Sequence, residues 1–250
     1  MFKNKVVIVT GSSSGIGRET AKIFAREGAN VVLHGQDETR LKEAEKEVQA
    51  ISNAGKTLSI RGPIQDEKTW EKIANETIKK FGRIDVLVNN AGSKDDGKDA
   101  NGLDCFTYCM EVNVKSVIGL SRACLPHLKE TKGNIINVSS ALEDKINPFA
   151  PMYAISKAAL KHYTHHAAFE YAPFGIRVNN VSPGLTDTYF HQRHMSSKPA
   201  QIQAVTNVIP LKRMGKPEEV GEMIAFVASD KCSYATGECF GVNGGIKIKP

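Results

Sequence analysis

Short apolar runs alternate along this chain with longer amphipathic stretches, and this alternation limits the fold more than any other feature. Strands that are apolar throughout belong in a parallel sheet that is covered on both faces. Six runs have this character: Val6–Val9, Val31–Leu33, Leu58–Ile60, Val86–Val88, Ile135–Val138 and Ile176–Val181. Five stretches between them are predicted helices: Gly17–Glu27, Thr39–Ala50, Glu67–Phe81, Phe106–Lys129 and Tyr153–Tyr171.

Regular alternation of strand and helix requires right-handed crossovers, which build one doubly wound α/β domain with a parallel sheet of about seven strands. The 250 residues contain no Pro/Gly/Ser linker, repeat or low-complexity tract, so residues 1–250 are predicted to form a single domain. Two irregular stretches stand out, Ser93–Gly102 and Thr186–Pro210. Loops of this length usually carry function. We expect residues 186–210 to form a substrate loop, in which Tyr189–Met195 either covers a partly apolar pocket or is an exposed connection.

A glycine-rich turn, Thr10-Gly-Ser-Ser-Ser-Gly-Ile-Gly17, directly follows the first strand and opens a helix. Glycines allow a tight turn and let the backbone approach a pyrophosphate, whose charge sits on free N–H groups at the helix N-terminus. The plainer interpretation is a Gly/Ser-rich turn without a ligand, but the place after the first strand favours dinucleotide binding.

Tyr153 and Lys157 lie four residues apart at the start of a predicted helix, so they share one helix face. A nearby ammonium favours the phenolate and lowers the pKa of a phenol from its usual value near 10. Tyr153 would then be a usable proton donor to a developing alkoxide. Taken alone, such a pair is more often solvated surface.

The order of these motifs resembles the short-chain dehydrogenase/reductase family in its single-domain form. The resemblance covers nearly all 250 residues, and it implies an NAD(P)-binding Rossmann domain over residues 1–250. Six motifs carry it: Thr10–Gly17, Asn89-Asn-Ala-Gly92, Asn113, Ser139-Ser140, Tyr153 with Lys157, and Ser182-Pro-Gly184.

The resemblance assigns four catalytic residues. Tyr153 would be the acid/base, and Ser140 would hold the substrate oxygen; Ser140 is preferred to Ser139 because the family's serine usually lies 13 residues before its tyrosine. Lys157 would bind the nicotinamide ribose and lower the pKa of Tyr153. Asn113 would fix a water that relays protons; the alternative is a helix-interior asparagine bonded to a backbone carbonyl.

The resemblance also implies a set of cofactor contacts. Within it, the Thr186 backbone and the Thr188 side chain would lie near the carboxamide, and residues 90–92 would lie against the adenosine ribose. Ile64 would meet the adenine through its N–H, although Pro63 stands where the family commonly has an Asp. The full set is Gly11, Ser13, Ser14, Gly15, Ile16, Gly17, Gln36, Arg40, Ile64, Asn90, Ala91, Gly92, Tyr153, Lys157, Pro183, Gly184, Thr186 and Thr188.

The end of the second strand bears on the choice between NADP and NAD. NAD users usually carry an acidic residue there, which accepts both ribose hydroxyls; this chain has Gly35, followed by Gln36 where NADP users often have Arg. Arg40 is either a phosphate contact or an ordinary exposed helix residue. Asp37 either disfavours a phosphate or caps the helix. We expect NADP, with NAD as the alternative.

Other features favour no additional function. The net charge of +6 is spread along the chain, which does not indicate nucleic-acid binding, and no apolar run of about 18 residues predicts a membrane span. Five cysteines without a CxxC motif are expected to be free thiols in a cytoplasmic protein. No metal is expected, because neither histidine group, His191 with His194 or residues 162–166, has an acid or Cys to complete it. Cys105 and Cys109 are expected to serve packing.

The sequence therefore predicts an NAD(P)-dependent oxidoreductase that interconverts a secondary alcohol and a ketone. The alternative is a catalytically silent, cofactor-binding regulator of the same fold. Family members are often homotetramers, so the same is expected here. Steroids, sugars, acyl thioesters and small ketones remain open as substrates, because the fold does not decide among them.

Overall fold

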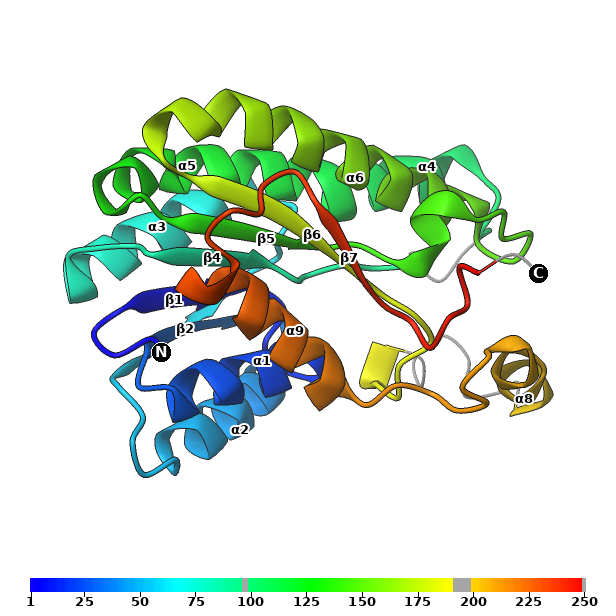
Figure 1. The fold of residues 1–250 in the computed structure, drawn as a ribbon, viewed down its shortest axis with the longest axis horizontal. Helices are drawn as coiled ribbons and strands as arrows, with labels where there is room; N and C mark the ends of the chain where they lie inside the picture. Colours follow the sequence, from blue (N-terminus) through cyan, green and yellow to red (C-terminus); the bar gives the residue numbers. More distant parts are fainter. Residues whose placement is uncertain (96–98, 191–198, 249–250) are drawn as a thin grey trace.

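Seven strands form one parallel sheet in the order β3-β2-β1-β4-β5-β6-β7 (Figure 1). The computed structural model describes residues 1–95, 99–190 and 199–248. The strand order reverses between β1 and β4, and ligands of open α/β sheets bind outside the carboxyl ends of the strands at such a point. The strands are β1 Val6–Val9, β2 Asn30–Gly35, β3 Thr57–Arg61, β4 Val86–Asn89, β5 Asn134–Val138, β6 Arg177–Pro183 and β7 Cys239–Val242.

Helices cover both faces of this sheet. In Figure 1, α1, α2 and α9 lie below the sheet, α3, α4, α5 and α6 lie above it, and α8 lies apart at one side. None of the helices in the described ranges is both long enough and apolar enough to cross a membrane. The helices are α1 Gly15–Arg26, α2 Glu38–Gln49, α3 Glu67–Phe81, α4 Leu103–Met110, α5 Ser116–Thr131, α6 Pro151–Tyr171, α8 Pro199–Val208 and α9 Pro217–Ala228.

Two hydrophobic cores lie on the two faces of the sheet, because successive strand side chains point to opposite sides. Along β1, Val7 and Val9 join the core under α1 and α9, where Phe24 is fully buried. Val6 and Ile8 join the other core, under α3, α5 and α6. The all-apolar strands are thus buried on both faces, which confirms the predicted α/β class with its parallel sheet of seven strands.

Three differences from the sequence prediction concern elements with weak local signals. The sequence pattern does not predict the strand β7, because Cys-Phe-Gly-Val contains a glycine and only one β-branched residue. The helix α8 lies within 186–210, which was predicted to be irregular. The single helix predicted over Phe106–Lys129 begins at Leu103 and is interrupted by a π-helical segment, Glu111–Lys115.

Candidate functional site

The turn between β1 and α1 depends on its glycines. Gly11 and Gly15 have φ values of +64° and +54°, a region that side chains other than glycine rarely adopt. Gly17 is needed for space, since a Cβ there would lie 2.5 Å from the Gly11 carbonyl oxygen. The first turn of α1 carries no acidic residue, and the Ser14 side chain does not cap it. This helix N-terminus therefore fits the pyrophosphate of a dinucleotide.

Asn90, which follows β4, fastens this turn to the next strand of the sheet. Its Nδ2 donates to the carbonyl oxygens of Thr10 at 2.8 Å and Gly11 at 3.2 Å. In return, Thr10 Oγ1 accepts the N–H groups of Asn90 and Ala91, both at 3.0 Å. Asn90 thus holds the glycine turn, and the expected contact of residues 90–92 with the adenosine ribose remains a prediction.

His34 is a supporting residue that the sequence reasoning missed. Its Nδ1 accepts the Gly11 N–H at 3.3 Å, and its Nε2 lies 3.0 Å from the Gly62 carbonyl oxygen. Burial lowers the pKa of His34 to about 4, so the ring is neutral and Nε2 is the donor to Gly62. A histidine inside an otherwise apolar strand was the available signal. This residue joins the glycine turn to the end of β3.

The end of β2 is shaped by close packing of Ser13 on Gly35. A Cβ at Gly35 would lie 2.8 Å from Ser13 Oγ, so an acidic side chain there requires Ser13 to move. Gln36 is exposed, and its carbonyl oxygen accepts from Arg61 Nε at 3.0 Å. Ile64, beyond β3, is buried. With Ser13 in its present place, position 35 therefore has no room for the acidic side chain that usually binds the ribose in NAD users.

Arg40 lies on the first turn of α2 and contacts two groups. Its guanidinium is paired with Asp37 at 3.2 Å and lies 4.3 Å from the centroid of the Tyr189 ring. The Asp37 carboxylate also accepts the Arg40 backbone N–H at 2.9 Å, which confirms that Asp37 caps α2. Arg40 is about one-third exposed, so a cationic group faces the end of β2 from the helix that follows it.

Tyr153 and Lys157 lie on the first turns of α6 and face the same space. Lys157 Nζ lies 5.6 Å from the centroid of the Tyr153 ring and donates to the Val138 carbonyl oxygen, at the end of β5, at 2.9 Å. Burial lowers the pKa of Lys157 to about 8, while the charge of Glu143 acts in the opposite direction. The ammonium is thus fixed between α6 and the carboxyl end of β5.

Ser140 caps the short 3-10 helix Ala141–Asp144 with its hydroxyl, which accepts the Leu142 N–H at 3.2 Å. Burial raises the pKa of Tyr153, and a hydrogen bond with Ser140 acts against this rise. The expectation that Lys157 lowers the pKa of Tyr153 below its usual value is therefore wrong for this structure, in which burial of the phenol outweighs its partners. Ser139 has a different role, since its hydroxyl donates to the Lys157 carbonyl oxygen at 3.2 Å.

Asn113 lies in the π-helical segment and binds the loop after β4. Its Oδ1 accepts the Ser93 N–H at 2.9 Å, and its Nδ2 donates to the Ser93 carbonyl oxygen at 2.8 Å and to Ser156 Oγ at 2.9 Å. Asn113 thus bonds to a backbone carbonyl, as the alternative interpretation expected, although this carbonyl belongs to the loop after β4 and not to a helix. A Cβ at Gly92 would lie 3.1 Å from Asn113 Oδ1 and 3.4 Å from Lys157 Nζ, so both side chains adjoin this loop. The proton relay remains a prediction.

The segment after β6 reaches the glycine turn from the other side. Gly184, after Pro183, packs so closely that a Cβ there would lie 2.8 Å from Asn243 Cα. Thr186 and Thr188 are both buried, and a Cβ at Gly15 would lie 3.1 Å from Thr188 Cβ. The structure therefore brings this segment to the edge of the sheet that carries the glycine turn.

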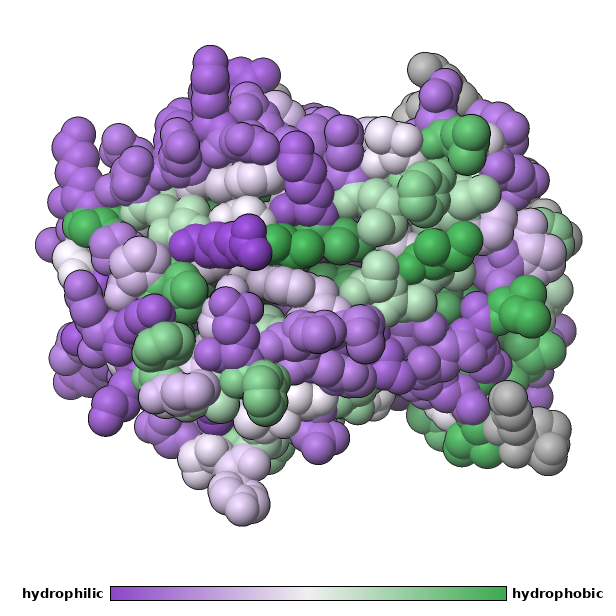
Figure 2. Space-filling view, turned by 90° about the horizontal axis from the view of Figure 1, so that it is seen from above, coloured by the Kyte–Doolittle hydropathy of each residue, from purple (hydrophilic) through white to green (hydrophobic). Residues whose placement is uncertain are grey.

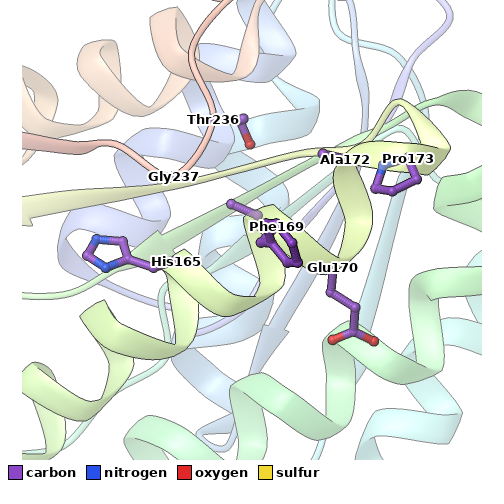
Figure 3. Close-up of a pocket in the computed structure, with 8 residues that line it drawn as sticks. His165, Phe169, Glu170, Ala172, Pro173, Thr236 and Gly237 are labelled. Atoms are coloured by element: carbon purple, nitrogen blue, oxygen red, sulfur yellow. The ribbon is translucent and has the colours of Figure 1, made fainter.

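Several other features lie apart from this edge. A surface hollow is lined by His165, Phe169 and Thr236, among others (Figure 3). Phe169 is 16 residues beyond Tyr153, or about 24 Å along α6, so this hollow belongs to another part of the surface. The described ranges contain no group of three His, Cys, Asp or Glu side chains that could hold a metal. His191 and His194 lie outside the described residues.

The fold and these contacts define a class of protein: a Rossmann-type α/β domain with a candidate dinucleotide site. Residues 11–247 match the family model described as enoyl-(acyl carrier protein) reductase. The chain is 36% identical to a 3-oxoacyl-[acyl-carrier-protein] reductase of Thermotoga maritima, over 99% of both chains. It therefore belongs to the short-chain dehydrogenase/reductase family, whose members are NAD(P)-dependent oxidoreductases.

Two solved structures extend the comparison. A short-chain dehydrogenase/reductase of unknown function from Caenorhabditis elegans, solved with cofactor, is 39% identical with a TM-score of 0.90, over 98% of this chain and 96% of that one. L-sorbose reductase from Gluconobacter frateurii, solved with NADPH and L-sorbose, is 28% identical with a TM-score of 0.91, over 100% of this chain and 98% of that one.

Proposed function

We propose that this protein interconverts a secondary alcohol and a ketone with NADP(H), and that Tyr153 is its acid/base. The observation that carries the proposal is the arrangement around Tyr153. Ser140 acts to lower the pKa of Tyr153 against the effect of burial, and Lys157 lies on the same helix face with Nζ 5.6 Å from the ring centroid. Both groups lie at the carboxyl end of β5, on the edge of the sheet that also carries the glycine turn.

Each residue has one task in the proposed reduction. The bound nicotinamide supplies the hydride. Tyr153 donates its proton to the substrate oxygen as negative charge develops there, and Ser140 holds that oxygen by a hydrogen bond. Lys157 binds the nicotinamide ribose. Asn113 holds the loop after β4 and a water through which the proton is replaced.

The preference for NADP is supported by the end of β2. Ser13 packs where an acidic side chain at position 35 would lie, and Arg40 supplies a cation on the next helix. Guanidinium groups suit phosphate recognition. A relative of the same fold, L-sorbose reductase, was solved with NADPH. We infer that Arg40 contacts the 2′-phosphate.

The substrate is proposed to be a small carbonyl compound bound beside an aromatic wall. Phe190, at the start of the proposed substrate loop 186–210, lies with its ring centroid 5.9 Å from that of Tyr153. A pocket with an aromatic face and the Ser140 and Tyr153 hydroxyls orients a ketone by its oxygen. The remainder of the loop includes residues outside the described ranges.

We also propose that the chain forms a homotetramer in the cytoplasm. Figure 2 shows the face on which α6 lies, where apolar side chains gather in a band between polar margins. Leu103 on α4 is 80% exposed and Phe169 on α6 is 87% exposed, so apolar side chains of these helices are available for contact with a second copy. The five free cysteines fit a reducing compartment. Light scattering after size-exclusion chromatography tests the assembly; a monomeric mass contradicts it.

The decisive experiment measures NADPH and NADH consumption with a panel of steroid, sugar, acyl-thioester and diketone substrates. Turnover with at least one ketone, at a lower KM for NADPH, supports the proposal. Binding of the dinucleotide without turnover of any substrate favours the alternative, a catalytically silent regulator. The site residues argue for an enzyme, because a regulator does not need Ser140 next to Tyr153.

A further inference from the structure

A buried carboxylate lies three residues beyond Ser140, in the 3-10 helix that Ser140 caps. The Glu143 side chain is fully buried and accepts from Ser182 Oγ at 2.6 Å, Cys239 Sγ at 2.8 Å and Asn180 Nδ2 at 2.9 Å. These donors come from β6 and β7. The glutamate therefore fastens the turn that carries Ser140 to two strands of the sheet.

The charge of Glu143 is balanced from the C-terminal segment. Lys247 Nζ lies 2.5 Å from Glu143 Oε1 and 3.0 Å from Asp144 Oδ2. Asp144 also accepts from Lys161 Nζ at 2.8 Å, and Lys161 lies one turn beyond Lys157 on α6. One lysine near the chain end thus joins the Ser140 turn, and through Asp144 it is connected to the helix of Tyr153.

We propose that Lys247 is a positioning residue for the reaction: with Glu143 it forms a clasp that fixes the Ser140 turn against β6 and β7. This inference rests on the proposed function, because it gives Lys247 a role in setting Ser140 beside Tyr153. Lys247 does not touch the reacting groups. It acts through Glu143 and Asp144, which hold the turn.

Removing one member of a buried ion pair leaves the other uncompensated, and the structure relaxes to hydrate it. If the charge of Lys247 is removed, the Glu143 carboxylate retains three neutral donors but loses the one cation in direct contact with it in the described residues. The turn then moves toward solvent, and Ser140 loses its fixed place. Small displacements of a positioned group lower kcat strongly. The glycine turn is held by His34 and Asn90 rather than by the clasp, so we expect it to keep its place.

The kinetic test uses Lys247→Met, which keeps the length of the side chain and removes its charge. We expect kcat to fall about tenfold to a hundredfold, with KM for the dinucleotide unchanged, and Lys247→Arg to restore most of the loss. Lys22→Met is the matched control. Lys22 bridges two carboxylates, Glu19 at 2.9 Å and Glu47 at 3.8 Å, at a similar exposure but between α1 and α2.

A second test does not depend on turnover. The Leu142 N–H is bound to Ser140 Oγ and the Glu143 N–H to the Ser140 carbonyl oxygen, so hydrogen exchange at these two amides reports on the turn. We expect exchange at least about tenfold faster in Lys247→Met and unchanged in Lys22→Met. A second variant replaces Lys247→Met if the single variant does not accumulate as folded protein. The double variant Lys247→Met with Glu143→Gln removes both charges of the pair. It is then compared with the wild type in kcat and in hydrogen exchange.

The two tests separate the clasp from the proposed function. If the wild-type protein turns over no substrate, the proposed function fails, and the exchange rates alone decide the clasp. If the wild-type protein is active, unchanged exchange in Lys247→Met, or a kcat within twofold of the wild type, overturns the clasp and leaves the proposed function intact. The clasp is supported by faster exchange and a lower kcat in Lys247→Met, together with recovery of kcat in Lys247→Arg.

Discussion

Lys157 Nζ lies 5.6 Å from the centroid of the Tyr153 ring, and the two side chains share one face of α6. The lysine is held in place by the Val138 carbonyl oxygen at the end of β5. Burial governs both groups, since it raises the pKa of Tyr153 and lowers that of Lys157 to about 8. A phenol in this setting keeps its proton at neutral pH, which suits the donor in a carbonyl reduction.

Replacement of Tyr153 by Phe removes the proposed proton donor while keeping the ring. We expect turnover to fall at least about a thousandfold, because general acid catalysis contributes on this scale. The dinucleotide Kd, measured by fluorescence titration, should change little. Tyr234→Phe is the control, since Tyr234 is fully exposed. Substantial residual turnover in Tyr153→Phe rejects the assignment.

Replacement of Ser140 by Ala removes the hydrogen bond that opposes the rise in the pKa of Tyr153. The pKa of Tyr153 should therefore move further upward, and the alkaline limb of the pH–kcat profile should move to higher pH. We expect kcat to fall about a hundredfold, as for loss of one positioned donor. Ser140→Thr, which keeps a hydroxyl, should retain more activity. An unchanged profile in Ser140→Ala contradicts the role.

Replacement of Arg40 by Gln tests the cofactor preference. Loss of a guanidinium contact with the 2′-phosphate should raise KM for NADPH about tenfold and leave KM for NADH nearly unchanged. Initial rates at varied dinucleotide concentration measure both. Arg26→Gln is the control, because Arg26 is exposed and lies at the C-terminal end of α1, away from the glycine turn. A wild-type protein that prefers NADH, or equal effects on both dinucleotides, overturns the choice of NADP.

The neutral state of His34 predicts a pH dependence of stability. The pKa of His34 is about 4 in the folded protein, whereas an ordinary histidine has a pKa of 6.5, so the unfolded chain binds more protons between these values. The free energy of unfolding should fall as pH drops from about 6.5 to 4, by about 3 kcal/mol from this residue. Urea titrations should show a smaller fall in His34→Gln. Equal pH dependence in both proteins contradicts the neutral, buried ring.

The local sequence was sufficient to predict those features that depend on residue spacing within one helix, strand or turn. Tyr153 and Lys157 share a helix face because four residues make about one turn. Gly11 and Gly15 were recognisable because only glycine readily adopts their positive φ values. The all-apolar strands predicted a parallel sheet, since only such a sheet is covered on both faces. These features follow from backbone geometry and side-chain type alone.

Contacts between distant segments were decided by the tertiary structure. Glu143 and Lys247 are 104 residues apart, and neither position has a local pattern that indicates a buried ion pair. His34 reaches Gly11 and Gly62 only because parallel pairing places β1, β2 and β3 side by side. The pKa of Tyr153 likewise depends on burial, which the spacing to Lys157 does not reveal. Sequence thus determined the elements and the reactive pair, whereas chain packing set their partners and their charge states.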